Sequence, residues 1–138
     1  YVSGGRGMVS GYTMFNDLEI TDYYPDYNEI YTNRLNVRFK TIGTYRLTKI
    51  DVPFTPQIVS MITLLDCIEK GYSIIDVNII RLHEIINAMA EDYSEAAFLM
   101  VTQSAPYHYS TIVTLKELLD KKGIKNNCMS IFERHKMK

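Results

Sequence analysis

The spacing of the hydrophobic residues changes near residue 55 of this chain, and that change constrains the fold more than any other feature. Over residues 34–50, apolar residues such as Leu35, Val37 and Phe39 alternate with polar and basic ones. Alternation of this kind places side chains on opposite faces of a β-strand. Beyond residue 55, the apolar residues recur at helical spacing instead. We therefore expect an α+β protein with its strands mostly in the first half and its helices mostly in the second.

The alternating segment, 34–50, is predicted to be an antiparallel β-hairpin whose register depends on its loop. A two-residue loop at 42–43 pairs Phe39 with Arg46 and mixes apolar and charged residues on one face. A three-residue loop pairs Phe39 with Leu47. Because a shift of one residue exchanges the two faces of a strand, we expect the three-residue loop. Short apolar runs with turn signals predict further strands near residues 12–20, 107–113 and 128–132.

Helices are predicted to pack on this hairpin. The first follows Thr55, a good N-cap, with Pro56 at the first helical position and Gly71 as terminator. Its apolar residues cover most of the circumference, so we expect it to be the central, buried helix. The predicted helices span residues 56–70, 74–91, 94–103 and 115–122.

Two of these helices have alternatives. The second, 74–91, carries a seam of five apolar residues. By default we expect this seam to pack in the core, and the alternative is a dimer formed through this helix. In the third, residues 97–102 serve equally as a buried strand. The seam consists of Ile75, Ile79, Leu82, Ile86 and Met89.

The chain has the size and composition of one globular domain. It contains 138 residues, of which 46% are hydrophobic and 22% charged. Residues 1–11 are predicted to be a flexible Gly-rich arm, 12–132 a single globular α+β domain, and 133–138 a basic tail. Abundant Ile, Tyr, Asn and Lys are typical of AT-rich genomes, which include those of many viruses and phages. A viral or phage origin is therefore part of the expectation.

Neither a long apolar run nor a signal-peptide pattern is visible, so we expect a cytoplasmic protein without a membrane partner, in the host cytoplasm or virion if it is viral. Cys67 and Cys128 have no Cys or His at metal-ligand spacing, so no metal or cofactor is predicted. His83 begins a metalloprotease-like pattern, but Asn87 stands where the second zinc ligand is needed.

Enzymatic activity is the weakest of three functional hypotheses. The Gly-rich arm lacks the Gly-Lys-Ser/Thr ending of a phosphate-binding loop. The patterns of a serine hydrolase, a two-histidine phosphoesterase and a metal-dependent nuclease are also incomplete. An enzyme with unfamiliar spacing would centre on His108 and Tyr109 near Thr114.

The leading hypothesis is a non-enzymatic protein–protein interaction or assembly module that binds a protein partner or its own copies. It depends on a segment, 12–31, in which tyrosines and acidic residues are interspersed. Tyrosine is enriched at interfaces because it combines contact area with a polar tip. A solvated loop with tyrosines folded onto the sheet is the simpler interpretation. The candidate interaction residues are Tyr23, Tyr24, Asp26, Tyr27 and Tyr31.

The alternative hypothesis is a nucleic-acid-binding regulatory protein that uses a basic hairpin face. The net charge is −1, yet residues 34–50 alone carry +5. Cations on one face would track phosphates, especially if the predicted C-terminal strand paired nearby and added its lysines. A basic edge also protects a hairpin against aggregation. The candidate nucleic-acid residues, expected on the face opposite Phe39, are Arg34, Arg38, Lys40 and Arg46.

Overall fold

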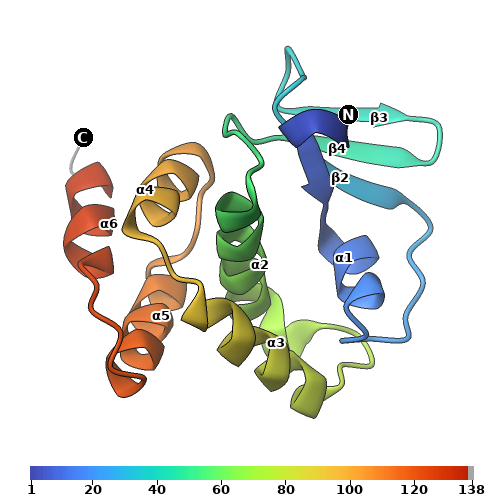
Figure 1. The fold of residues 1–138 in the computed structure, drawn as a ribbon. Coiled ribbons are helices and arrows are strands. Elements are labelled where there is room, and N and C mark those ends of the chain that lie inside the picture. The colour runs from blue at the N-terminus through green and yellow to red at the C-terminus, as the bar shows by residue number, and fades with distance from the viewer. Residues whose placement is uncertain (137–138) are drawn as a thin grey trace.

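The computed structural model describes residues 1–136 and shows an N-terminal sheet followed by packed helices (Figure 1). The predicted α+β class is confirmed. The strands are β1 (Gly7–Val9), β2 (Asn28–Thr32), β3 (Phe39–Ile42) and β4 (Tyr45–Lys49). The helices are α1 (Gly11–Asp17), α2 (Pro56–Lys70), α3 (Ile79–Glu91), α4 (Glu95–Ser104), α5 (Tyr109–Lys121) and α6 (Cys128–Lys136).

The four strands form one mixed sheet in the order β1-β2-β4-β3. β2 runs antiparallel to β1 and parallel to β4, and β4 runs antiparallel to β3. β3 is therefore an edge strand, and all four of its residues are exposed. Figure 1 shows the β3–β4 hairpin on the opposite side of α2 from α4, α5 and α6.

The hairpin prediction is confirmed, but the predicted loop is wrong. A two-residue loop, Gly43 and Thr44, joins the strands, and Phe39 pairs with Thr48 rather than with Leu47. Gly43 has a φ of 58°, and the first position of a type II′ turn requires a positive φ. Side-chain alternation does not determine the register here, because β3 is exposed on both faces. Neither register of such a strand buries more apolar surface than the other.

α2 has the predicted bounds and is the central helix. The Thr55 side chain accepts a hydrogen bond from the Ile58 backbone N–H at 3.3 Å, Pro56 opens the helix and Gly71 follows its last residue. All residues in the range 61–67 are buried. The helix packs against α3, α4 and α5. It lies between the sheet and α4, α5 and α6 in Figure 1, so the expectation of a buried central helix is confirmed.

The second and third predicted helices exist with changes. α3 begins at Ile79 instead of residue 74, because the Asn78 side chain caps it at the Arg81 N–H, at 3.1 Å. In the predicted seam Leu82 is fully buried, whereas Ile75 is 49% exposed. Residues 97–102 lie within α4, so their strand alternative is wrong.

Three predicted strands are wrong, because the segments 12–20, 107–113 and 128–132 are mainly helical. Short apolar runs have the same appearance in strands and helices, and tertiary packing decides between them. In α1 the adjacent residues Met14 and Phe15 are both buried, which an amphipathic strand does not allow. α5 begins well before residue 115, and its buried residues recur on one helical face.

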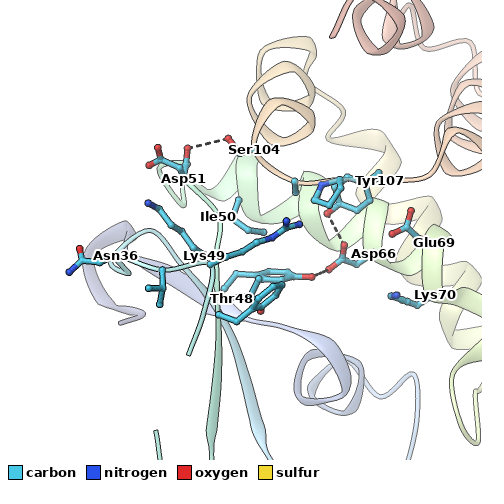
Figure 2. A pocket seen from close by; sticks show the side chains of 16 residues that line it. Asn36, Thr48, Lys49, Ile50, Asp51, Asp66, Glu69, Lys70, Ser104 and Tyr107 are labelled. Atoms are coloured by element: carbon cyan, nitrogen blue, oxygen red, sulfur yellow. Dashed lines mark hydrogen bonds between the residues drawn. The ribbon is translucent and has the colours of Figure 1, made fainter. Parts of the chain in front are cut away.

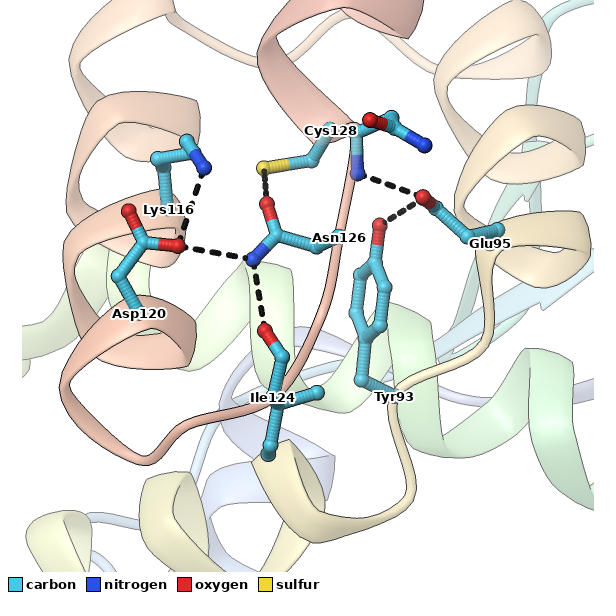
Figure 3. Close-up of polar contacts among 8 residues, drawn as sticks. Tyr93, Glu95, Lys116, Asp120, Ile124, Asn126 and Cys128 are labelled. Atoms are coloured by element: carbon cyan, nitrogen blue, oxygen red, sulfur yellow. Dashed lines mark hydrogen bonds and ion pairs between the residues drawn. The ribbon is translucent and has the colours of Figure 1, made fainter.

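α6 begins after a polar turn organised by Asn126 (Figure 3). The Asn126 Nδ2 donates to Asp120 Oδ1 at 3.1 Å, and its Oδ1 accepts from Cys128 Sγ at 3.2 Å. The backbone N–H of Asn127 donates to Glu95 Oε1 at 2.5 Å. These bonds hold the start of α6 against α4 and α5, far from the sheet edge where a C-terminal strand was expected.

The N-terminal segment takes part in the sheet. Within the predicted arm, Gly7 and Met8 are buried, and β1 pairs with β2. Gly7 is needed because a Cβ at this position would collide with the backbone oxygens of Tyr1 and Tyr31. The mobility of residues 1–11 stays a prediction. The predicted basic tail, 133–138, begins within α6, and its residues 137 and 138 lie outside the described part of the chain.

Among residues 1–136, no helix is both long enough and apolar enough to cross a membrane.

Candidate binding cleft and edge strand

A cleft of about 650 Å³ lies between the hairpin side of the sheet and α2 with the α4–α5 loop (Figure 2). One wall is formed by β3, β4 and the loop before β3, and the other by α2 and the α4–α5 loop. Phe39 and Val37 contribute apolar surface to the first wall, and they are 64% and 52% exposed. We call this cavity the Asp66 cleft, after the carboxylate at its floor.

Asp66 connects α2 to the sheet and to the α4–α5 loop through two tyrosines. Tyr31 on β2 donates its hydroxyl to Asp66 Oδ2, and Tyr107 in the α4–α5 loop donates to Oδ1, both at 2.7 Å. Figure 2 shows the Tyr107 hydroxyl directed at the Asp66 carboxylate and marks both hydrogen bonds with dashed lines. A buried polar group is stable only with such partners. The cluster therefore holds the sheet and the α4–α5 loop at fixed positions relative to α2.

Burial dominates the electrostatics of this cluster. It raises the pKa of Asp66 from 3.8 to about 6, although hydrogen bonds from Tyr31 and Tyr107 act in the opposite direction. The pKa of each tyrosine is raised by burial and by the neighbouring carboxylate. Both hydroxyls therefore remain protonated donors over the whole range in which Asp66 titrates.

A second carboxylate of α2 caps a neighbouring helix. Glu69 Oε1 accepts hydrogen bonds from the backbone N–H of His108 at 2.7 Å and from Thr111 Oγ1 at 3.0 Å. The His108 Nδ1 lies 3.2 Å from the same oxygen, although its side chain is 78% exposed. A carboxylate at a helix N-terminus satisfies N–H groups that have no partner within the helix. Glu69 therefore explains why α5 begins at residue 109.

The cluster suggested for an enzyme does not converge on one point. His108 contacts Glu69, the Tyr109 ring lies 6.4 Å from the Phe132 ring, and Thr114 donates back to its own helix at Ser110 O. Within residues 1–136, no group of three or more His, Cys, Asp or Glu side chains is arranged to hold a metal ion.

The outer edge of β3 presents backbone groups to solvent. The Lys49 N–H donates to the Arg38 carbonyl at 2.8 Å, so the backbone of Arg38 faces β4. In an antiparallel ladder the inward and outward orientation alternates along the strand. Lys40 and Ile42 therefore also face β4, whereas the N–H and C=O groups of Phe39 and Thr41 point away from the sheet.

The structure divides the predicted tyrosine-rich site. Tyr31 belongs to the Asp66 cleft, whereas Tyr23, Asp26 and Tyr27 line a separate shallow cavity of about 340 Å³ near α1. Tyr24 is 80% exposed. Tyr23 stacks edge-on against Tyr12, with ring centroids 4.8 Å apart. The five predicted residues therefore do not form one continuous strip.

The predicted basic face is also divided, and its description as one face is wrong. Arg46 lies over the Tyr27 ring at 3.8 Å, and Arg38 lies 5.3 Å from the Phe39 ring. Lys40 pairs with Leu47 on the opposite face from the Phe39–Thr48 pair. The observed register of the hairpin contributes to this division, because it places Arg46 and Lys40 on different faces of the sheet.

The fourth cation and the C-terminal cations are remote from that edge. Arg34 lies before β3 and lines a separate cavity with Tyr1 and Arg6. Among the described residues, Lys121 and Lys122 lie at the end of α5 and Arg134 lies within α6, on the far side of the molecule from the hairpin (Figure 1). The condition for a continuous basic surface, a C-terminal strand beside the hairpin, is therefore not met.

Sequence analysis missed Asp66, Glu69 and Tyr107. One signal was present: Asp66 is an acidic residue within the helix that the apolar pattern marks as buried, and a buried carboxylate needs partners. Its partners lie 35 and 41 residues away, and no local pattern identifies them.

Comparisons with protein-family models, curated proteins and solved structures give no match for this chain.

Proposed function

We propose that this protein is a protein–protein interaction module that binds an extended segment of its partner along β3. The observation that carries the proposal is the exposure of this edge strand. All four residues of β3 are exposed, and apolar side chains along the hairpin remain exposed on both faces of the sheet. These are Val37, Phe39, Ile42 and Tyr45, with exposed fractions between 42% and 64%.

An edge of this kind is uncommon in a chain that has no use for it. Unpaired N–H and C=O groups on an edge strand are a template for another strand, and proteins normally protect them. Here the one charged residue of β3, Lys40, opposes pairing only with strands of like charge. Addition of a partner strand supplies main-chain hydrogen bonds and places alternate side chains in neighbouring pockets. The Asp66 cleft beside Phe39 supplies such a pocket.

The geometry favours a protein partner over a nucleic acid. Phosphate tracking needs cations aligned on one surface. The four predicted hairpin cations instead lie in different surroundings, two of them against aromatic rings. Nucleic-acid binding therefore enters as a competing outcome of the test.

The test uses Thr41, whose N–H points away from the sheet. Random extended peptides are selected on the wild-type protein and measured against Thr41→Pro and Thr41→Val. Proline removes the outward donor and places its ring at the docking edge, yet leaves the bonds to β4 intact. Valine keeps the donor and the β-branched shape. We expect at least about tenfold weaker binding to Thr41→Pro only, from one lost hydrogen bond of about 1 kcal/mol plus the steric clash.

Circular dichroism and thermal unfolding of both variants serve as the control for folding. Equal binding to all three proteins contradicts the proposal, and so does a selection that yields no wild-type binder. Retention of single-stranded DNA that is lost in Arg38→Glu plus Lys40→Glu, without peptide binding, supports the nucleic-acid alternative instead.

A further inference from the structure

We infer that the segment bound by β3 is acidic, with carboxylates on the Lys40 face of the sheet and apolar side chains over the Asp66 cleft. This inference rests on the proposed function and adds the chemistry of the partner. It follows from the charge around β3, the alternation of side chains along it, and the different surroundings on its two faces.

The hairpin is uniformly basic. Residues 34–50 contain five cations and no acidic residue. Lys40 lies within β3, Arg38 directly precedes it, and Lys49 pairs beside Arg38 at the end of β4. A strand that docks on this edge passes within contact distance of these cations. Opposite charges on adjacent strands stabilise the pairing, and like charges oppose it.

The two faces of the edge differ in what they accept. Lys40 shares a face with its partner Leu47, while Phe39 shares the other face with Thr48 and Tyr31. Side chains of an added strand continue the same alternation. Those next to Phe39 therefore lie over the cleft, and those next to Lys40 lie on the opposite face.

The cleft side favours apolar guests. Phe39 is 64% exposed there and Val37 52%, so both have contact surface to offer. Asp66 and Glu69 supply two carboxylates from α2 to this cleft, and Arg38, Lys49 and Lys70 also line it. A carboxylate placed beside the buried Asp66 would be desolvated, whereas an apolar side chain gains contact with Phe39 and Val37. We therefore place the apolar side chains of the partner over the cleft and its acidic side chains next to Lys40.

A second copy of this chain does not fit the same edge. The outward backbone groups of Phe39 and Thr41 permit an antiparallel pair of β3 strands centred on Lys40, which places the two ammonium groups opposite each other. In any other alignment two hairpins of charge +5 still meet. Repulsion of this kind opposes self-pairing.

Three synthetic octapeptides test the inference by fluorescence anisotropy at about 50 mM and about 300 mM salt. The first alternates Glu with Val, the second alternates Lys with Val, and the third has the composition of the first with its four Glu in one block. We expect the alternating Glu peptide to bind at least about tenfold more tightly than either of the others. We also expect the higher salt to weaken this binding.

Protein variants assign the effect to the two faces. Lys40→Glu should remove most of the preference for the Glu peptide over the Lys peptide, and Lys40→Gln, the matched control, should reduce it by less. Phe39→Ala should weaken binding of the alternating Glu peptide, while the preference for the Glu peptide over the Lys peptide stays unchanged. Circular dichroism confirms that each variant is folded.

The outcomes separate this inference from the proposed function. If the Lys peptide binds as tightly as the Glu peptide and both lose affinity in Thr41→Pro, the acidic partner is wrong and strand addition stands. If Thr41→Pro alters neither, strand addition itself fails. A dimer in sedimentation velocity that Thr41→Pro dissociates identifies a second copy as the occupant and overturns the inference.

Discussion

Replacement of Asp66 by asparagine should change how stability depends on pH. The carboxyl group has a pKa of about 6 in the folded protein, against 3.8 without the fold. Because the folded state binds this proton more tightly, the stability associated with it is present below about pH 4 and is lost as pH rises through 6. A pKa difference of about two between the folded and unfolded protein corresponds to about 3 kcal/mol in the free energy of unfolding. The asparagine side chain of the variant is uncharged at every pH and has a similar shape.

The measurement is urea unfolding of wild type and Asp66→Asn between pH 4 and 7.5. We subtract the wild-type free energy of unfolding from that of the variant at each pH, which cancels the titration of all other groups. This difference should rise by about 2–3 kcal/mol across the range, whatever constant offset the new amide introduces. A difference that stays flat, or falls with pH, refutes the burial argument.

An exposed carboxylate provides the control for this experiment. The pKa of Asp120 is lowered by hydrogen bonds from Lys116 and Asn126, and its side chain is exposed. The stability that this carboxylate contributes has the opposite pH dependence. It is present above the pKa of the unfolded chain and is lost as pH falls. Asp120→Asn should therefore not reproduce the rise seen with Asp66→Asn.

Two further substitutions test local interactions. Glu69→Ala removes the cap from the His108 end of α5 and should lower the free energy of unfolding by about 1–2 kcal/mol. The control, Glu84→Ala, replaces an exposed residue and should change this free energy little. Urea unfolding measures both variants. Gly7→Ala places a Cβ against the Tyr31 backbone and should cost about 1–3 kcal/mol, with faster amide exchange in β1 and β2. An unchanged exchange rate would contradict this close approach.

The parts of the fold that sequence predicted correctly depend on neighbouring residues. Thr55, Pro56 and Gly71 mark both ends of α2 through backbone chemistry within one turn, so the bounds were predictable. The hairpin was predictable as an element for a similar reason. Its register was not, because the argument assumed one buried face and β3 has none.

The incorrect predictions concern features that depend on residues far apart in the sequence. The start of α5 depends on Glu69, which lies 39 residues before His108, the residue whose N–H group it accepts. The candidate site was missed in the same way. Tyr31 was selected for its residue type, yet its role depends on Asp66 in a different element. Patterns within a segment carry no information about such partners.

The position of Asp66 suggests why the molecule contains a costly buried carboxylate. Apolar residues of similar size are often more stabilising in such sites, so stability alone does not account for it. Asp66 lies where β2, α2 and the α4–α5 loop meet. Its hydrogen bond from Tyr31 links the sheet to α2, and its hydrogen bond from Tyr107 holds the α4–α5 loop against α2. Asp66→Leu should then weaken the alternating Glu peptide even if it raises the free energy of unfolding at pH 7, whereas Asp66→Asn should retain most of the affinity. Equal affinities for the two variants would show that the hydrogen bonds do not position the cleft.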